Sequence, residues 1–199
     1  MPKLNKEFYE RSNVLLISRE LLGKVLCTNY NGKLTSGIIV ETEAYAGVID
    51  KASHAYDNKK TNQTKIMYDS GGIAYIYLCY GIHHLFNVVT NSKNIPHAIL
   101  IRAIEPINGI ETMLKRRKKK NKGYTLTSGP GSLTKALGIT INDSGKSLMS
   151  NLIWIENQKN INANNVISSP RVGIQYAKDD ISNPWRYRIK NNPWTSPAK

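Results

Sequence analysis

The sequence predicts a mixed α+β fold in a single domain, and three observations favour it. At 199 residues, the chain is long enough for one domain with a substantial core. Strand-like segments recur along it, and two of them are joined by Asn31-Gly32, a dipeptide typical of hairpin turns. Segments with helical periodicity lie before and after these strands, and no linker composition interrupts the chain. We therefore expect one domain over residues 1–199.

The first part of the chain is predicted to be a helix followed by a β-hairpin. Apolar residues recur with helical spacing over residues 14–22, with Ser12 or Asn13 as N-cap and Gly23 as terminator. The two strands of the hairpin are expected on either side of the Asn31-Gly32 turn, at residues 24–30 and 35–45.

The middle of the chain combines a long loop with a second hairpin. Residues 46–70 are polar, contain glycine and show no period. Loops of this length inside a compact domain tend to be functional. The tyrosine-rich segment 73–80 reads as a strand that ends at a turn signal, Gly81, and residues 84–90 read as the returning strand.

The remaining elements are predicted from shorter signals. A strand is expected at residues 98–104, buried on both faces except at Arg102. A helix is expected to begin at Pro106 and to end in a basic tract, residues 115–122. Residues 128–133 are expected to open a short helix that ends at Gly138. Further strands or turns are expected at residues 152–155, 170–174 and 184–188.

The charge of the chain favours a polyanionic partner. The formal net charge is +14 and the pI is near 9.8, which indicates nucleic acid before a membrane surface. The basic tract supplies half of this charge. Contacts from it to phosphates would make binding strongly salt-dependent. The simpler alternatives are a solvated helix end and a soluble lysine-rich protein.

Cysteine and histidine spacing argues against a metal site. Cys27 and Cys79 are the only cysteines and are far apart, so we expect both to be reduced. His83 and His84 are adjacent and would face apart on a strand, and no third ligand has suitable spacing. Because no apolar leader or membrane-length apolar run is present, we expect a soluble cytoplasmic protein associated with the nucleoid.

Two carboxylates near the end of the strand at 35–45 are the first candidates for catalysis. Strand periodicity places Glu41, Glu43 and Tyr45 on one face, and Val40 and Ala44 on the opposite, core face. A carboxylate beside apolar residues and a phenol can serve as a general base. The alternative is a structural glutamate paired with a lysine. Periodicity alone does not distinguish Glu41 from Glu43.

The aromatic residues that follow suggest contacts with a nucleobase. Tyr77 and Tyr80 are three residues apart, so in a regular strand they face opposite ways. Either one of them is core, or the strand bends before Gly81 and Tyr80 projects as a wedge. Wedges of this kind unstack bases in DNA, and enzymes that act on a base must extrude it. His54 in the long loop could hydrogen-bond a substrate, although a lone histidine is more often a surface residue.

A set of motifs in one order spans the chain from Phe8 to Trp194. The motifs are Gly37-Ile38-Ile39-Val40-Glu41-Thr42-Glu43-Ala44-Tyr45, the following His54, Tyr75-Ile76-Tyr77-Leu78-Cys79-Tyr80-Gly81 with Asn87, Leu100-Ile101-Arg102-Ala103-Ile104-Glu105-Pro106, Ser128-Gly129-Pro130, Ala136-Leu137-Gly138-Ile139, Pro170-Arg171-Val172-Gly173 and Pro193-Trp194. Through them the chain resembles the 3-methyladenine DNA glycosylases of the mammalian alkyladenine type.

The resemblance implies a hydrolytic reaction. Glu43, the second acid of Glu-Thr-Glu-Ala-Tyr, would be the general base for the attacking water, and Arg102 would help Glu43 to hold that water. Members of the family are monofunctional, form no Schiff base, leave an abasic site and use no cofactor. They act on double-stranded DNA that contains damaged purines, and one chain suffices, so we expect a monomer.

The resemblance also implies a base pocket and a fold. Tyr45, His54 and Tyr77 would enclose the extruded base, and Asn87 would line the pocket and exclude normal bases, chiefly guanine. Tyr80 would be the wedge in the minor groove. The implied fold is a single domain around a curved antiparallel sheet, with a protruding β-hairpin and flanking helices.

The chain departs from the family pattern at two places. Members commonly have Thr-x-Arg-Asn before a Met-aromatic pair, whereas this chain has Gln63 and Thr64 at the last two of those positions. Many members have a lysine where this chain has Ser132. The first departure affects how the long loop is held, and Lys135 or the basic tract would have to supply the charge missing at the second.

These inferences predict a DNA repair glycosylase that excises alkylated purines, with 3-methyladenine as the first substrate. 7-Methylguanine, hypoxanthine and ethenoadenine are further candidates. The alternatives are a basic RNA- or ribosome-binding module without catalysis, and a hydrolase of free nucleosides that uses the same acid.

Overall fold

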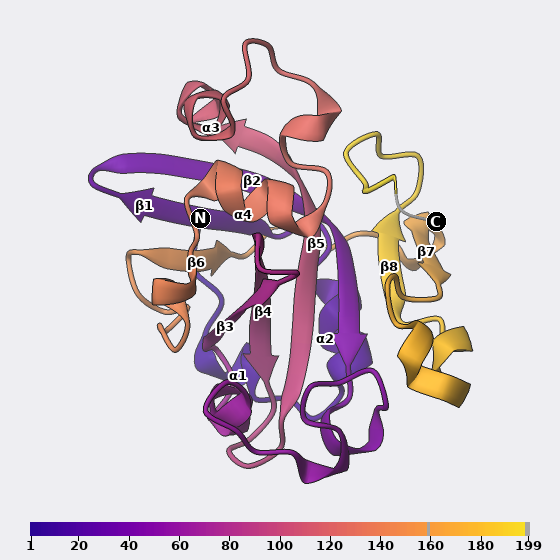
Figure 1. The fold of residues 1–199 in the computed structure, drawn as a ribbon. Coiled ribbons are helices and arrows are strands. Elements are labelled where there is room, and N and C mark those ends of the chain that lie inside the picture. Colours follow the sequence, from indigo (N-terminus) through magenta and orange to yellow (C-terminus); the bar gives the residue numbers. More distant parts are fainter. Residues whose placement is uncertain (159, 198–199) are drawn as a thin grey trace.

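Figure 1 shows the fold in the computed structural model, which describes residues 1–158 and 160–197. An antiparallel sheet runs in the order β3-β4-β5-β2-β1-β6, with β8 paired to β2 and β7 to β8. The helices are α1 (Lys6–Tyr9), α2 (Val14–Glu20), α3 (Ile110–Arg117) and α4 (Pro130–Leu137). No helix in this described part of the chain has the length and apolarity needed to cross a membrane. The strands are β1 (Val25–Tyr30), β2 (Lys33–Tyr45), β3 (Ala74–Cys79), β4 (His83–Thr90), β5 (His97–Asn108), β6 (Ile153–Glu156), β7 (Val166–Ser169) and β8 (Arg186–Ile189).

Strand β2 organises the sheet and curls it. Its first half pairs with β1 and its second half with β8, while β5 pairs along most of its length. Register shifts between Ser36 and Gly37, and on both sides of Glu41, bend the strand. Helix α2 packs against β2 and β5, and α4 packs against β4 and β5 (Figure 1). The predicted α+β class with a curved antiparallel sheet is therefore confirmed.

Local signals predicted the first helix and hairpin correctly. The Asn13 side chain accepts a hydrogen bond from the Leu16 N–H and caps α2, and Gly23 follows with a φ of 84°. Asn31 and Gly32 have φ values of 53° and 74°, as the two central residues of a tight hairpin turn require. In both places a side chain or a permitted φ sets the local geometry without help from distant residues.

The predicted start of the helix before the basic tract is wrong. Pro106 and Ile107 belong to β5, which stays paired with β2 as far as Asn108, and α3 begins only at Ile110. Pro106 lies next to a register shift, where the missing N–H of proline removes no regular ladder bond. Gly109, with a φ of 72°, turns the chain from the strand into the helix.

The prediction that Arg102 interrupts burial of its strand is also wrong. Arg102 is 5% exposed, and it lies in a buried cluster around Glu41. The Glu41 carboxylate accepts hydrogen bonds from Arg102 Nε at 2.8 Å and Arg186 Nε at 2.7 Å. It also accepts the backbone N–H and the hydroxyl of Ser196. This cluster ties β2, β5, β8 and the C-terminal segment together.

We expect Glu41→Gln to lower the free energy of unfolding by about 3 kcal/mol, because it leaves two buried guanidinium groups without a charge that they share. Urea unfolding of the variant and of Glu111→Gln, an exposed site on α3, would measure this. The exposed variant should change stability by less than about 0.5 kcal/mol. Equal stability of the two variants would show that the cluster does not hold the sheet.

Candidate active site

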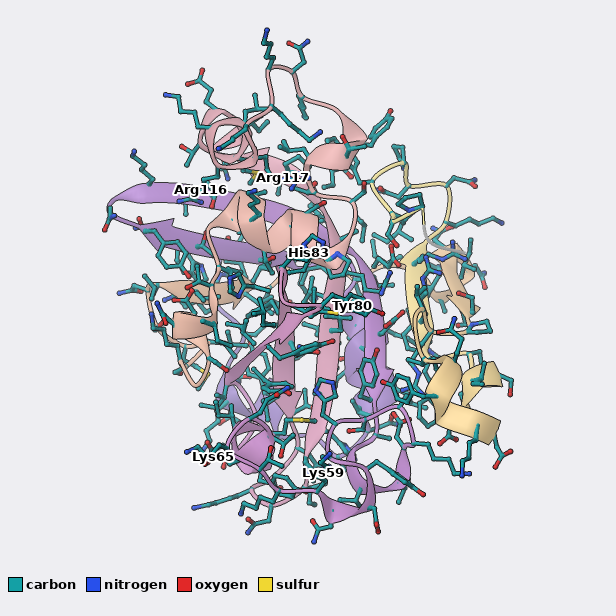
Figure 2. The ribbon with its side chains drawn as sticks, viewed as in Figure 1. Lys59, Lys65, Tyr80, His83, Arg116 and Arg117 are labelled. Atoms are coloured by element: carbon teal, nitrogen blue, oxygen red, sulfur yellow. The ribbon has the colours of Figure 1, made fainter. Side chains whose placement is uncertain are left out.

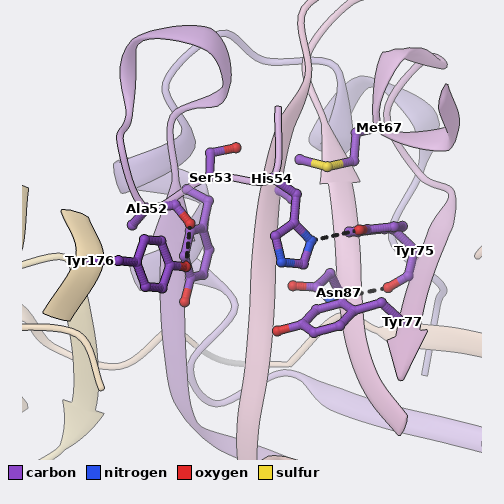
Figure 3. Close-up of a pocket in the computed structure, with 10 residues that line it drawn as sticks. Ala52, Ser53, His54, Met67, Tyr75, Tyr77, Asn87 and Tyr176 are labelled. Atoms are coloured by element: carbon purple, nitrogen blue, oxygen red, sulfur yellow. Dashed lines mark hydrogen bonds between the residues drawn. The ribbon is translucent and has the colours of Figure 1, made fainter. Parts of the chain in front are cut away.

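A cleft of about 410 Å³ lies between the β3–β4 hairpin, the start of α4 and residues 172–176. Behind it is a cavity of about 30 Å³ lined largely by aromatic side chains (Figure 3). Tyr45, Tyr77 and Tyr176 line both spaces. The cavity has room for a water molecule but not for a purine. A base that enters it must therefore move its walls apart.

Glu43 is fully buried directly behind residues that line the cleft. Its Oε2 accepts a hydrogen bond from the Tyr45 hydroxyl at 2.8 Å, and its Oε1 accepts the Val172 N–H at 2.8 Å. Arg102 Nη1 lies 3.3 Å from the same Oε1. All three of these donors belong to residues that line the cleft. A carboxylate has about four lone-pair sites, so Oε2 retains one for a water molecule.

Arg102 connects the two acids and gives them different surroundings. Its Nε bonds Glu41 while its Nη1 faces Glu43. Burial lowers the pKa of Arg102, but the charges of Glu43 and Glu41 outweigh that and raise it, so the guanidinium stays charged. Glu41 is enclosed by arginine and serine donors, whereas the partners of Glu43 all line the cleft. The structure therefore distinguishes two acids that strand periodicity left equivalent.

Arg171 is a residue of the site that sequence reasoning did not single out. Its guanidinium forms two hydrogen bonds to the Asp50 carboxylate, and both side chains are fully buried. It lies 4.8 Å from the Tyr45 ring centre and 4.9 Å from that of Trp185. The next residue, Val172, donates its N–H to Glu43. The only sequence signal was an arginine in a Pro-Arg-Val-Gly segment with no assigned partner.

His54 and two tyrosines form one wall of the small cavity. His54 Nδ1 lies 2.8 Å from the Tyr75 hydroxyl, and its ring centre lies 4.5 Å from that of Tyr77. Burial and the charge of Lys59 lower the pKa of His54, which favours the neutral ring. Burial raises the pKa of Tyr75 to about 12, so that hydroxyl keeps its proton.

Asn87 lines the same cavity with a fixed orientation. Its amide nitrogen donates to the backbone carbonyls of Tyr75 and Leu85, at 3.2 and 3.3 Å. Figure 3 shows its side-chain oxygen turned away from these partners, toward the space in front of Tyr176. The pocket wall therefore presents an acceptor at this point.

The hairpin tip projects from the protein. Tyr77 turns inward to the cavity, while Tyr80, with a φ of 50°, is 88% exposed at the end of the hairpin. Leu78 and Ile82 beside it are also exposed. The two tyrosines thus face different ways, as their spacing predicts. The predicted protruding hairpin is confirmed, with an apolar tip.

Basic side chains lie on both sides of this tip in Figure 2, with Lys59 and Lys65 below it and Arg116 and Arg117 above it. Arg117 Nη2 donates to the Ser132 hydroxyl at 3.0 Å. The basic tract thus places a guanidinium against Ser132. Lys135 is an exposed residue of α4.

Gln63 and Thr64, the two residues of the long loop that depart from the pattern, are both hydrogen-bonded. Gln63 Nε2 donates to the Tyr75 hydroxyl at 3.3 Å. The Thr64 hydroxyl donates to the Lys59 carbonyl at 2.9 Å and accepts the Thr61 N–H at 2.8 Å. These bonds hold the loop against the wall that carries His54. Within the described residues, no three His, Cys, Asp or Glu side chains come close enough to hold a metal ion.

Sequence comparison identifies the family. The profile of the Methylpurine-DNA glycosylase (MPG) family matches residues 7–193. A protein of Chlamydia felis named "Putative 3-methyladenine DNA glycosylase" is 50% identical over 187 residues, which is 94% of this chain and 95% of that one. Proteins of the same name from Alkaliphilus oremlandii and Clostridium perfringens (strain SM101 / Type A) are 44% and 40% identical, and each match covers 98% of both chains. With this match over nearly all its length, and with a buried acid beside an aromatic cavity, the chain belongs to the methylpurine-DNA glycosylase family and is a DNA glycosylase of base excision repair.

Proposed function

We propose that this glycosylase excises alkylated purines from double-stranded DNA by hydrolysis, with Glu43 as the general base. The observation that supports this most directly is the placement of Glu43. It is a buried carboxylate whose partners, Tyr45, Arg102 and Val172, line the cleft, and Tyr45 also lines the aromatic cavity. Tyr80, at the exposed hairpin tip, lines the same cleft. These are the parts needed to extrude a base, hold it and direct water at its sugar.

In the proposed reaction, a water molecule on Glu43 Oε2 transfers a proton to the carboxylate as its oxygen bonds to C1′ of the sugar. The bond between C1′ and the purine nitrogen breaks, and its electron pair leaves with the base. Arg102, whose Nη1 lies 3.3 Å from Oε1, orients the carboxylate. No amine attacks the sugar, so the product is an abasic site and the enzyme is monofunctional.

The charge of the lesion accounts for the choice of substrate. Alkylation at N3 or N7 makes the purine cationic, so it leaves as a neutral base. A cationic ring also gains about 0.5 to 2 kcal/mol from aromatic faces such as those of Tyr45 and Tyr77. 3-Methyladenine is the proposed main substrate, with 7-methylguanine as a second. Neutral lesions such as hypoxanthine and ethenoadenine gain neither advantage.

Asn87 is proposed to discriminate against normal guanine. Both hydrogens of its amide face backbone carbonyls, so the group is fixed. Guanine carries an amino group at C2 that would have to fit against this buried side chain, whereas adenine derivatives have no amino group at that carbon. 7-Methylguanine keeps the C2 amino group, which is why it is proposed only as a second substrate after 3-methyladenine. One chain holds a complete pocket and a single wedge, Tyr80, which supports action as a monomer.

We expect Glu43→Gln to lower the single-turnover rate on duplex DNA containing 3-methyladenine by at least about 100-fold, because the amide cannot take the proton of the water. Affinity for the same duplex should change less than about twofold. Release of free base and abasic sites would measure the rate, and Glu111→Gln is the matched control. Wild-type turnover by Glu43→Gln would remove Glu43 from the reaction. Tight RNA binding by the wild-type protein without base release would instead favour the RNA-binding alternative.

We expect Tyr80→Ala to slow excision from duplex DNA by about tenfold or more, because unstacking a base step costs a few kcal/mol that the wedge offsets. Excision from single-stranded DNA should change much less, since no partner strand has to be opened. Ile49→Ala, which removes another exposed apolar side chain, serves as control. If Tyr80→Ala acted on both substrates at the wild-type rate, the tip would not be a wedge.

A further inference from the structure

The hydroxyl of Tyr75 forms a bridge between two residues of the long loop, Gln63 and His54. Tyr75 is buried on β3, and its hydroxyl oxygen lies 2.8 Å from His54 Nδ1 and 3.3 Å from Gln63 Nε2. An amide nitrogen only donates hydrogen bonds. Gln63 therefore occupies one of the two acceptor sites of the hydroxyl, and of the two hydrogen-bond partners only His54 Nδ1 can accept the proton of this buried Tyr75. The direction of hydrogen bonding runs from Gln63 to Tyr75 to His54.

We propose that Gln63, acting through Tyr75, is a positioning residue that fixes His54 as the neutral imidazole protonated on Nε2. Nδ1 then accepts the hydrogen bond from Tyr75, and Nε2 carries the N–H. Figure 3 shows Nε2 on the side of the ring away from Tyr75. A glutamine is well suited to this because it donates without adding a charge. The direction of these hydrogen bonds depends on the residue at position 63. At that position this chain has glutamine in place of the arginine of the Thr-x-Arg-Asn pattern.

The same bond opposes protonation of His54. In the imidazolium both nitrogens carry protons. Nδ1–H and the Gln63 amide would then both donate to the Tyr75 oxygen. Neither of these two groups could accept the proton of the Tyr75 hydroxyl. Among the described residues, four titratable groups face His54. They are Lys59 from the long loop, Tyr75 and Tyr77 from β3, and Tyr176 on the opposite wall. Burial and Lys59 both lower the pKa of His54.

The neutral ring matters because of the charge on the substrate, and this step rests on the proposed function. A cationic alkylated purine in the cavity would stand beside the His54 ring. An imidazolium there would repel it, whereas a neutral ring offers an aromatic face and an N–H. Gln63 would thereby make excision of cationic purines independent of pH across the range in which free histidine titrates, near 6.5.

The first test measures His54 in the free protein and needs no DNA. Imidazole ¹⁵N chemical shifts distinguish the two neutral forms and report the pKa, and His54→Gln assigns the signals. For the wild type we expect protonated Nε2 and a pKa below 6.5. Gln63→Glu should raise that pKa by about one unit or more, because the carboxylate accepts the Tyr75 proton and the oxygen then accepts Nδ1–H. Gln63→Arg keeps a donor and should keep both the tautomer and the low pKa.

A double variant shows whether the effect passes through Tyr75. In Tyr75→Phe, which lacks the bridging hydroxyl, adding Gln63→Glu should shift the His54 pKa by much less than it does in the wild type. Protonated Nδ1 in the wild type would overturn the proposal. So would an unchanged pKa in Gln63→Glu, or a shift of the same size with and without the Tyr75 hydroxyl.

The second test follows single-turnover excision of 3-methyladenine from pH 5.5 to 8.5. The rate of Gln63→Glu should fall at least about tenfold below the wild-type rate at pH values below its raised His54 pKa, and it should recover above that pKa. Gln63→Arg should show the same shape of pH profile as the wild type, with an absolute rate lowered by the added charge. A Gln63→Glu profile parallel to that of the wild type would overturn the role of the neutral ring. If the wild type excised no base at all, the proposed function would fail, but the chemical shifts would still decide the tautomer.

Discussion

One arginine between two buried acids is the constraint on which the site depends. Arg102 reaches Glu41 through Nε and Glu43 through Nη1, and its Nη2 donates to Ser196. Because Arg186 and Ser196 complete the shell around Glu41, that acid serves the fold. Glu43 shares the arginine but is left beside the cleft. Two chemically identical side chains, two residues apart on one strand, thus have different surroundings. Among the described residues, all three partners of Glu43 line the cleft, whereas Arg186 and Ser196, which bond Glu41, do not.

The pocket combines a basic protein with an uncharged aromatic cavity. The net charge of +14 attracts the phosphate backbone, yet the cavity is lined by tyrosines, a histidine with a lowered pKa and an asparagine. Such a cavity suits a flat base, including one that carries positive charge. Attraction of the phosphate backbone and contact with a base would therefore fall to different residues. Because the cavity is small, a base that entered it would have to move its walls apart.

Sequence reasoning succeeded where a signal is local. Asn13 caps its helix and Asn31-Gly32 form their turn through their own backbone preferences. It failed at Pro106, where pairing with β2 extends the strand beyond a residue that usually favours its end. It could not separate Glu41 from Glu43, because the deciding partners, Arg186 and Ser196, lie 145 and 155 residues away. Asp50 and Arg171, 121 residues apart, were missed for the same reason. The resemblance supplied the site residues that periodicity left open, and their roles stay predictions.

The most direct test of the account is a crystal structure of the wild-type protein on duplex DNA with a 7-methylguanine whose sugar carries a 2′-fluorine, which resists cleavage because fluorine disfavours a cationic sugar. The account predicts an extruded purine between Tyr45 and Tyr77, and a water molecule within about 3 Å of both Glu43 Oε2 and C1′. A nucleotide seated in the cleft with C1′ out of reach of any water on Glu43, or a purine still stacked in the duplex of a stable complex, would contradict it.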